Sequence, residues 1–396
     1  MFIKKFSSET KKVLSAFVIW RVALFAIALL AIYMIPSWGG RYPYWDTALQ
    51  ITKLPSWIWS FGGFDGVHYL RIAQDGYASA NYQTFFPLYP LLIRFLNFFS
   101  RNPLLDLRIF VDPSYFYTGL ILANAFFVLG LYYFYKLLRL DFNKRISFWS
   151  LILLLAFPTS YYFGAIYTES LFLFLAAGSI YSTRKHNFLL AGALAGLASA
   201  TRILGLMLLP LIIIEFYLYL RSTGKIAIIK KAKACLGVAV APLGAVLYMI
   251  YLKATTGDYL YFLTAQPSFG AERSAQPFIL LPQVVYRYLK IFLTVPLGSL
   301  NFFNAGVEFV FALGSLLLLV IYWKKMRLSY WIFTFGCLII PTLTGTFSSM
   351  PRYALLGLFI LPFVARRPKL AKALAVVFVL FAVILISLFT RGYWVG

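Results

Sequence analysis

Long apolar runs recur along the chain and limit what it can fold into. The first covers residues 13–35, and comparable runs follow as far as residue 390. A run of about eighteen or more apolar residues is typical of a helix that crosses a bilayer. With 62% hydrophobic and only 12% charged residues among 396, a soluble globular protein is excluded. The sequence therefore predicts an all-α polytopic membrane protein.

The basic residues predict how these helices are oriented. Lys and Arg outnumber Asp and Glu by 36 to 12, for a formal net charge of +24, but they stand in short clusters between apolar runs. That is the pattern of cytoplasmic loops, so no nucleic-acid partner is expected. The predicted spans are 13–35, 115–138, 147–166, 168–183, 187–200, 203–220, 234–252, 299–323, 328–346, 352–365 and 370–390. With a cytoplasmic N-terminus, these crossings place every basic cluster, including the one around Lys225, on the same side.

Three apolar segments are too short to cross a bilayer on their own. Residues 85–99 are interrupted by two prolines and Arg94, so we expect an interfacial helix on the outer leaflet there. Residues 187–200 and 352–365 are kept as crossings because the alternation of basic loops requires them.

One integral membrane domain is expected over residues 1–396. Its largest non-spanning pieces are a first outer loop, 36–114, and a second outer loop, 253–298. Membrane insertion hardly constrains acidic residues, so their distribution can report function. The acidic residues placed outside are Asp46, Asp65, Asp75, Asp106, Asp112, Glu169, Asp258 and Glu272. This bias predicts that any chemistry faces outward.

The densest polar cluster lies at residues 64–77 of the first outer loop. If the segment after Asp65 is helical, His68, Arg71 and Asp75 share one face, and Asp65 is a neighbour of His68. Asp65 either caps this helix by accepting a first-turn amide hydrogen, beside a solvated polar stripe, or acts as a base in a site. Both can hold together, because a capping carboxylate is held rigidly.

Three further side chains at outer helix ends are candidates for substrate binding. Glu169 opens a predicted span, where a carboxylate either suits the helix dipole or binds sugar hydroxyls. Arg202 and Arg352 are each either a snorkelling anchor or a partner for a phosphate. Two arginines at one predicted depth favour a shared anionic ligand.

Some kinds of site are missing from the sequence. His68 and His186 fall on opposite sides of the membrane and no Cys/His cluster occurs, so no metal and no cofactor are expected. The outer acidic residues form no D-x-D pair, and no glycine-rich phosphate loop is present. An outward carboxylate without nucleotide-binding machinery favours a substrate activated on a lipid carrier.

Several motifs, in order along the chain, are similar to those of one family. An acidic residue in the first outer loop, followed by an interfacial helix and many spans, resembles the GT-C superfamily of polyprenyl-phosphate-sugar glycosyltransferases. More closely, the chain resembles the PIG-V-like mannosyltransferases. The motifs that carry this likeness are Phe64-Asp65-Gly66-Val67-His68-Tyr69, Ile72-Ala73, Gly76-Tyr77, Phe85-Phe86-Pro87-Leu88-Tyr89-Pro90, Phe157-Pro158-Thr159-Ser160, Tyr167-Thr168-Glu169-Ser170-Leu171-Phe172, Ala200-Thr201-Arg202 and Pro351-Arg352-Tyr353. Most family members begin the first motif with Trp-Asp, where this chain has Phe64.

The resemblance implies a GT-C-like bundle of about eleven transmembrane helices and a glycosyltransferase reaction. A hexose, with mannose favoured, would pass with inversion from a polyprenyl-phosphate donor to a hydroxyl of a glycan, glycolipid or protein acceptor. Asp65 would be the general base, and His68, Arg71, Glu169, Arg202 and Arg352 would bind substrate. Compact loops and the lack of a retention tail favour a bacterial plasma membrane.

Two other classes of function compete with this hypothesis. A transporter or flippase of lipid-linked saccharide would show inverted repeats, broken spans and charges at mid-membrane depth. Arg21 and Glu215 are the clear intramembrane charges, and no repeat is evident. A structural membrane subunit without chemistry is the third possibility.

Overall fold

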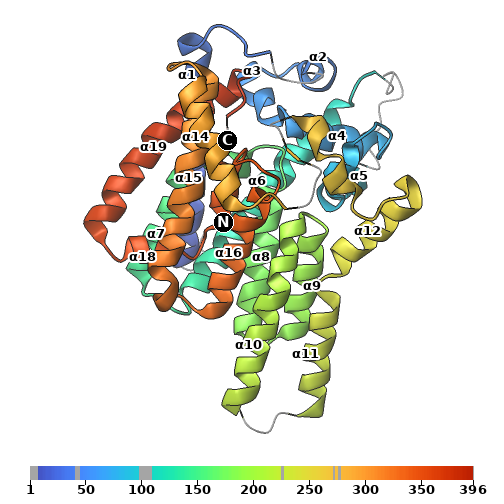
Figure 1. Ribbon diagram of the computed structural model, residues 1–396, viewed down its shortest axis with the longest axis vertical. Coiled ribbons are helices and arrows are strands. Elements are labelled where there is room, and N and C mark those ends of the chain that lie inside the picture. The colour runs from blue at the N-terminus through green and yellow to red at the C-terminus, as the bar shows by residue number, and fades with distance from the viewer. Residues whose placement is uncertain are drawn as a thin grey trace. The chain divides into compact units, whose positions relative to one another are not determined.

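The computed structural model is built from helices (Figure 1). It describes residues 8–40, 45–97, 109–223, 227–270, 273–274 and 278–395, and none of these residues lies in a β-strand. Three residues used for the predicted topology lie outside this set, namely Asp106, Lys225 and Glu272. Two compact units are present: residues 1–76, 89–178 and 364–394 form the first, and residues 77–88, 179–363 and 395–396 form the second.

The first unit combines long apolar helices with short helices of the first outer loop. Its helices are α1 (Ser8–Met34), α2 (Trp45–Ala48), α3 (Ser56–Trp59), α4 (Asp65–Asp75), most of α5 (Leu88–Leu96), α6 (Pro113–Leu138), α7 (Lys144–Ala156), the first part of α8 (Glu169–Arg184) and α19 (Pro368–Thr390). Local sequence sets several of these starts. Asp112 caps α6 by accepting the Ser114 amide hydrogen at 2.9 Å, and Asn143 caps α7 through the Ile146 amide at 2.9 Å.

Helices far apart in sequence pack together in the first unit. Helix α19 lies against α1 and α7, and α1 also contacts α6. Aromatic rings fill the interior: Phe127 stacks on Phe163 with ring centroids 4.5 Å apart, and Trp20 lies 4.7 Å from Phe127. The first unit is therefore closed by a helix from near the end of the described chain.

The second unit contains the remaining helices. They are α9 (Phe188–Ser199), α10 (Leu208–Thr223), α11 (Ile228–Val240), α12 (Leu243–Thr256), α13 (Tyr261–Thr264), α14 (Leu281–Thr294), α15 (Leu300–Tyr322), α16 (Leu328–Thr342), α17 (Met350–Tyr353) and α18 (Leu361–Ala365), of which α18 ends in the first unit. Helix α9 packs along α11, and α10 along α16. The α9–α11 approach is close enough that a Cβ on Gly192 would lie 1.9 Å from the Gly237 carbonyl oxygen.

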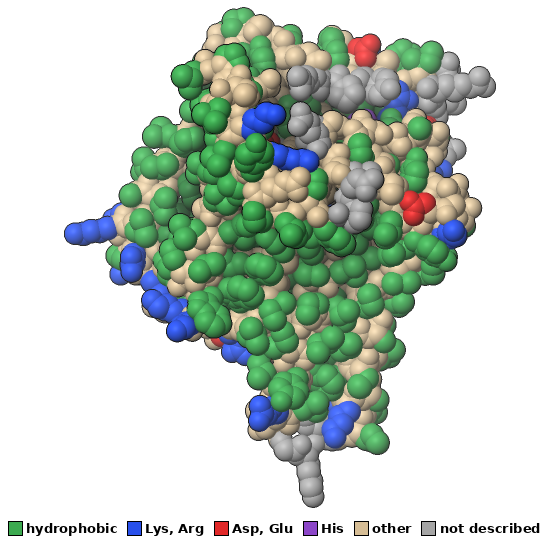
Figure 2. Space-filling view, in the orientation of Figure 1, with side chains coloured by type: hydrophobic (Ala, Val, Ile, Leu, Met, Phe, Trp, Pro, Cys, Tyr) green, Lys and Arg blue, Asp and Glu red, His purple; other side chains and the backbone are tan. Residues whose placement is uncertain are grey.

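The helices establish an integral, multi-pass membrane protein. Among the described residues, six segments are long and apolar enough to cross a bilayer: Ser8–Met34, Pro113–Leu138, Ile203–Thr223, Ile228–Thr256, Leu300–Lys325 and Pro368–Thr390. Hydrophobic side chains predominate on the face in Figure 2, and Lys and Arg side chains stand where α10 and α11 approach their connecting loop. The alternation of apolar spans with basic loops on one side of the membrane stays a prediction.

The predicted count of about eleven spans holds only in part, because several predicted crossings are short or broken. Predicted span 147–166 ends as a helix at Ala156, two residues before Pro158. Helix α9, within predicted span 187–200, has 12 residues and is about 18 Å long, against a hydrocarbon core of about 30 Å.

Residues 352–365 are not one continuous helix, contrary to prediction. The segment consists of the end of α17, a 3₁₀ turn at Ala354–Leu356, an irregular stretch and α18. Gly357 and Pro362 interrupt it, and nearly all of it is buried. Irregular backbone is tolerated at membrane depth where protein covers it.

Both predicted outer loops contain helices, and the helix expected within residues 85–99 is confirmed. Within 85–99, α5 forms and leaves the apolar side chains Leu91, Phe95 and Leu96 exposed, while its interfacial position stays a prediction. In the second outer loop, α14 is a fourteen-residue amphipathic helix, for which the sequence analysis assigned no helix.

Candidate active site

A sharp turn presents Asp65 at the start of α4. The 3₁₀ turn Ser60–Gly62 leads through Gly63 to Phe64, whose φ of 55° and ψ of −119° are rare for a residue with a side chain. The Phe64 ring lies 5.4 Å from that of Phe389 and 5.2 Å from that of Trp394. Asp65 is the first helical residue, so Phe64 and not Asp65 occupies the capping position.

The loop before α8 binds this turn. The Ile166 amide donates to the Phe61 carbonyl oxygen at 2.8 Å. The Tyr167 hydroxyl donates to the Gly63 carbonyl oxygen at 3.1 Å and accepts the Asp65 amide hydrogen at 3.2 Å. Two motifs about a hundred residues apart are therefore joined directly at Asp65.

Asp65 and His68 form a carboxylate–imidazole pair on α4. Both side chains are half-buried. Burial lowers the pKa of His68 from its usual value, and this effect outweighs the Asp65 carboxylate, which raises it. A neutral imidazole has one nitrogen that donates a hydrogen bond and one that accepts, so His68 can bind a substrate hydroxyl in either way beside the Asp65 carboxylate.

Arg71 is engaged within the first outer loop. Its guanidinium donates to Thr47 Oγ1 at 3.4 Å and to the Ile109 carbonyl oxygen, and its Nη1 lies 3.7 Å from Asp75 Oδ2. The face shared by Arg71 and Asp75 is thus confirmed. Arg71 is 9% exposed, so in this structure the guanidinium ties together separate parts of the loop.

Glu169 lies in the buried interior of the first unit. It is the first residue of α8 and only 1% exposed. Burial raises the pKa of Tyr89, and the nearby Tyr69 and Glu169 raise it further. The rings of Tyr69 and Tyr89 lie 5.7 Å apart. Glu169 and the two tyrosines therefore belong to one polar–aromatic region beside α4.

In the second unit, Arg202 and Arg352 converge on one aromatic ring. The guanidinium carbons lie 5.3 Å and 5.9 Å, respectively, from the centroid of Tyr353. Arg202 is half-buried, and Arg352 is 8% exposed. Two cations held at one ring form an electropositive point that suits an anion.

The sequence analysis missed two residues that hold the turn before Arg352. Tyr288 donates to Glu308 Oε2 at 2.5 Å and accepts the Phe347 amide hydrogen at 3.1 Å. Burial, with Glu308 beside it, raises the pKa of Tyr288. Ser349, three residues before Arg352, has a φ of 65°. No local spacing in the sequence relates Tyr288 to Glu308 or to Phe347.

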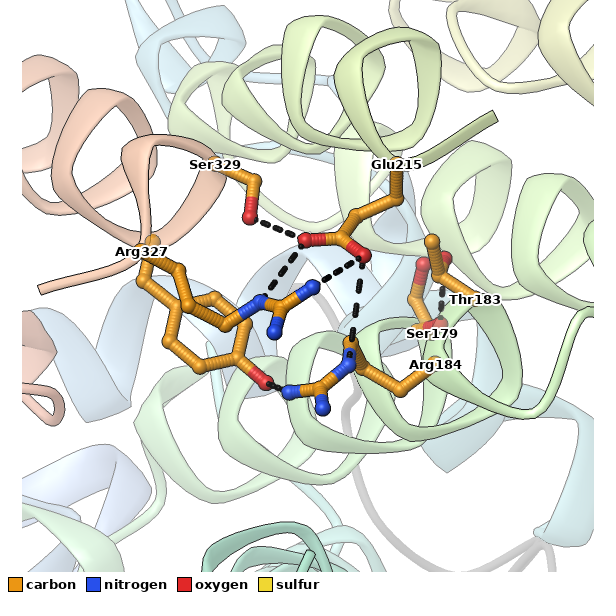
Figure 3. A network of polar contacts seen from close by, with 7 residues as sticks. Ser179, Thr183, Arg184, Glu215, Arg327 and Ser329 are labelled. Atoms are coloured by element: carbon orange, nitrogen blue, oxygen red, sulfur yellow. Dashed lines mark hydrogen bonds and ion pairs between the residues drawn. The ribbon is translucent and has the colours of Figure 1, made fainter. Parts of the chain in front are cut away.

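A second polar centre surrounds Glu215 of α10, where this helix meets the start of α16 (Figure 3). Arg327 donates to Glu215 Oε1 and Oε2, both at 3.1 Å. Ser329 donates to Oε1 at 2.5 Å, and Arg184 Nε lies 3.9 Å from Oε2. Glu215 is thus a buried hub that joins α8, α10 and α16. Across the described parts of the chain, no three His, Cys, Asp or Glu side chains are grouped as around a metal ion.

Comparison with known proteins identifies the family. The helices and their composition define the class, an integral membrane protein with several spans. A family model described as mannosyltransferase (PIG-V) matches residues 49–386. The chain therefore belongs to the PIG-V mannosyltransferase family, which confirms its resemblance to the PIG-V-like mannosyltransferases.

Individual relatives are distant. GPI mannosyltransferase 2 of Drosophila pseudoobscura pseudoobscura is 28% identical over 142 residues, which are 35% of this chain and 29% of that protein. The apo oligosaccharyltransferase of Archaeoglobus fulgidus is 15% identical, with a TM-score of 0.45 over 97% of this chain and 56% of its own. Its complex with Zn and sulfate gives 14% and 0.43 over 94% and 53%.

Proposed function

We propose that the protein transfers mannose from a polyprenyl-phosphate donor to an acceptor hydroxyl, with Asp65 as general base. The observation that carries the proposal is the placement of Asp65 on a bound turn, half-buried and beside a neutral His68. We further propose that the shorter apolar helices complete a GT-C-like bundle of about eleven crossings.

The proposed reaction is a single displacement with inversion. The acceptor oxygen forms a bond to the anomeric carbon while the bond from that carbon to the phosphate oxygen breaks. The electron pair of the broken bond leaves with the polyprenyl phosphate. The acceptor proton passes to the Asp65 carboxylate, a transfer typically worth about 10²–10⁴ in rate.

Two arginines are proposed to neutralise the donor phosphate. Arg202 and Arg352, which converge on Tyr353, would stabilise the negative charge that grows as the donor phosphodiester becomes the departing phosphate monoester. Glu169 is proposed to bind a sugar hydroxyl, and His68 is proposed to contact the substrate beside the base. Arg71 is proposed to contribute to substrate binding by holding together the loop segments at Thr47 and Ile109. The acceptor is a glycan, glycolipid or protein hydroxyl at the outer face of a bacterial plasma membrane.

Transport of a lipid-linked saccharide remains the alternative. Unpaired charges inside the membrane would favour it, but Glu215 pairs with Arg327 and Arg184, and the Arg21 guanidinium lies over the rings of Phe25 and Phe61. Neither charge therefore favours the transporter.

Turnover by purified protein tests the proposal. We would incubate it with polyprenyl-phosphate mannose, or with the glucose analogue, and an acceptor panel, and would follow donor consumption and product anomeric configuration. Asp65→Asn should lower turnover by at least about 10²-fold. Asp75→Asn is the matched control, because Asp75 lies on the same helix, is exposed and pairs with Arg71, and it should change turnover little. If Asp65→Asn turns over the donor as fast as the unchanged protein, Asp65 is not the general base. If the protein moves the donor across a bilayer without consuming it, the result favours the transporter.

A further inference from the structure

One hydroxyl group binds both sides of the turn that carries Asp65. Tyr167 Oη contacts the Gly63 carbonyl oxygen at 3.1 Å and the Asp65 amide nitrogen at 3.2 Å. Amides in the first turn of a helix have no partner within the helix. A capping side chain usually supplies one, but the side chain of Phe64 at the capping position makes no such hydrogen bond. The Tyr167 hydroxyl takes over that role from about a hundred residues away.

The backbone between these two bonds is strained. Phe64 has a φ of 55°, and a bulky residue remains in this region only where its surroundings hold it there. Its ring is held by Phe389 and Trp394. Its neighbours in the chain, Gly63 and Asp65, are both held by the Tyr167 hydroxyl.

The Tyr167 side chain is itself fixed. It is 1% exposed, and its ring centroid lies 4.9 Å from that of Tyr162 and 6.2 Å from that of Phe389. The residue before it, Ile166, is bound to Phe61 through its amide. The hydroxyl therefore has a fixed position, from which its two hydrogen bonds hold the strained turn in place.

We infer that Tyr167 is a positioning residue for Asp65: its hydroxyl holds the strained turn so that the carboxylate keeps its place for proton transfer. This inference rests on the proposed role of Asp65 as base. Without the hydroxyl, Phe64 can relax toward an ordinary conformation and carry the carboxylate with it. Donor binding would be preserved, because Tyr167 is buried beneath the turn, so the loss would fall on kcat and not on KM.

The test is Tyr167→Phe, which removes only the oxygen. A carboxylate displaced by about 1 Å can cost about 10²-fold, so we expect kcat to fall by roughly that factor with KM for polyprenyl-phosphate mannose within about twofold. Tyr248→Phe is the matched control. Tyr248, in the second unit, is 3% exposed, and its hydroxyl donates to the Gln83 carbonyl oxygen at 2.6 Å. It should lose similar thermal stability yet keep nearly full kcat.

A second variant keeps the inference testable if Tyr167→Phe does not fold. A Cβ at Gly66 would lie 3.3 Å from the Ile166 carbonyl oxygen, so Gly66→Ala pushes the turn away while favouring the helix. We expect kcat to fall there too, with KM unchanged. This inference alone is overturned if Asp65→Asn is inactive but Tyr167→Phe keeps full kcat. If Tyr167→Phe does not fold, full kcat in Gly66→Ala has the same meaning. Active Asp65→Asn overturns the proposed function and this inference with it.

Discussion

Removing the charge of Glu215 should destabilise the protein more than removing the charge of its main partner. Glu215 is 6% exposed and serves two guanidinium groups and one hydroxyl. In Glu215→Gln, the Arg184 side chain, which is 13% exposed, loses its carboxylate in a buried place. Breaking a buried ion pair from one side costs about 3–5 kcal/mol. We expect about 3 kcal/mol, because the Arg327 side chain is 41% exposed and water can stabilise it.

Arg327→Gln should cost less, about 1 kcal/mol, because an exposed partner contributes little. Glu215 would still keep Arg184 and Ser329. The double variant should lose less than the sum of the single losses, with a coupling energy of about 1–2 kcal/mol. The measurement is the unfolding free energy from detergent titration in mixed micelles. The reasoning fails if Arg327→Gln costs as much as Glu215→Gln, or if the two losses add within about 0.5 kcal/mol.

Three further predictions concern other parts of the molecule. Burial lowers the pKa of His68, so the unfolded chain binds a proton at this side chain more readily than the folded chain does. The stability that neutral His68 contributes is therefore present above about pH 6.5 and is lost as the pH falls below that value. His68→Gln should reduce this loss in denaturation curves measured from about pH 5 to 7. Gly192→Ala would force a Cβ to within 1.9 Å of a carbonyl oxygen and should lower the unfolding free energy by about 1–3 kcal/mol. Gly314→Ala, with open space around its Cβ, should instead raise the unfolding free energy by up to about 1 kcal/mol. Equal thermal unfolding temperatures for the two variants would contradict the close α9–α11 packing. Tyr288→Phe deprives Glu308 of a donor and the Phe347 amide of its acceptor, and it should lower the unfolding free energy by about 1–3 kcal/mol. A change under about 0.5 kcal/mol would show that the turn before Arg352 does not depend on the Tyr288 hydroxyl.

The sequence could predict what depends on local pattern. The long apolar runs gave α1, α6, α15 and α19 within a few residues of their observed bounds, and spacings of three and four gave the shared face of α4. Family motifs also drew attention to the segments around Asp65 and Tyr167. These successes rest on periodicity and composition, which are properties of neighbouring residues.

The rest depends on tertiary contacts that no local pattern contains. The break in residues 352–365 is tolerated because other parts of the protein bury it, and apolarity alone could not reveal that. The hydroxyl of Tyr167 finds its partners at Gly63 and Asp65 across about a hundred residues. Likewise, Tyr288 has no spacing that points to Glu308 or Phe347. The roles of Arg202 and Arg352 in binding a donor remain predictions.

The contact between Phe64 and the segment around Phe389 and Trp394 constrains the order of events during synthesis. The ring that precedes the proposed base is enclosed only when α19 has been inserted into the bilayer, more than three hundred residues later. Between them the ribosome must deliver residues 179–363, which make up most of the second unit. A nascent chain halted anywhere in that interval would carry Asp65 and Tyr167 but lack the enclosure of this turn. The turn that carries the proposed base is therefore completed only after α19 has been synthesised.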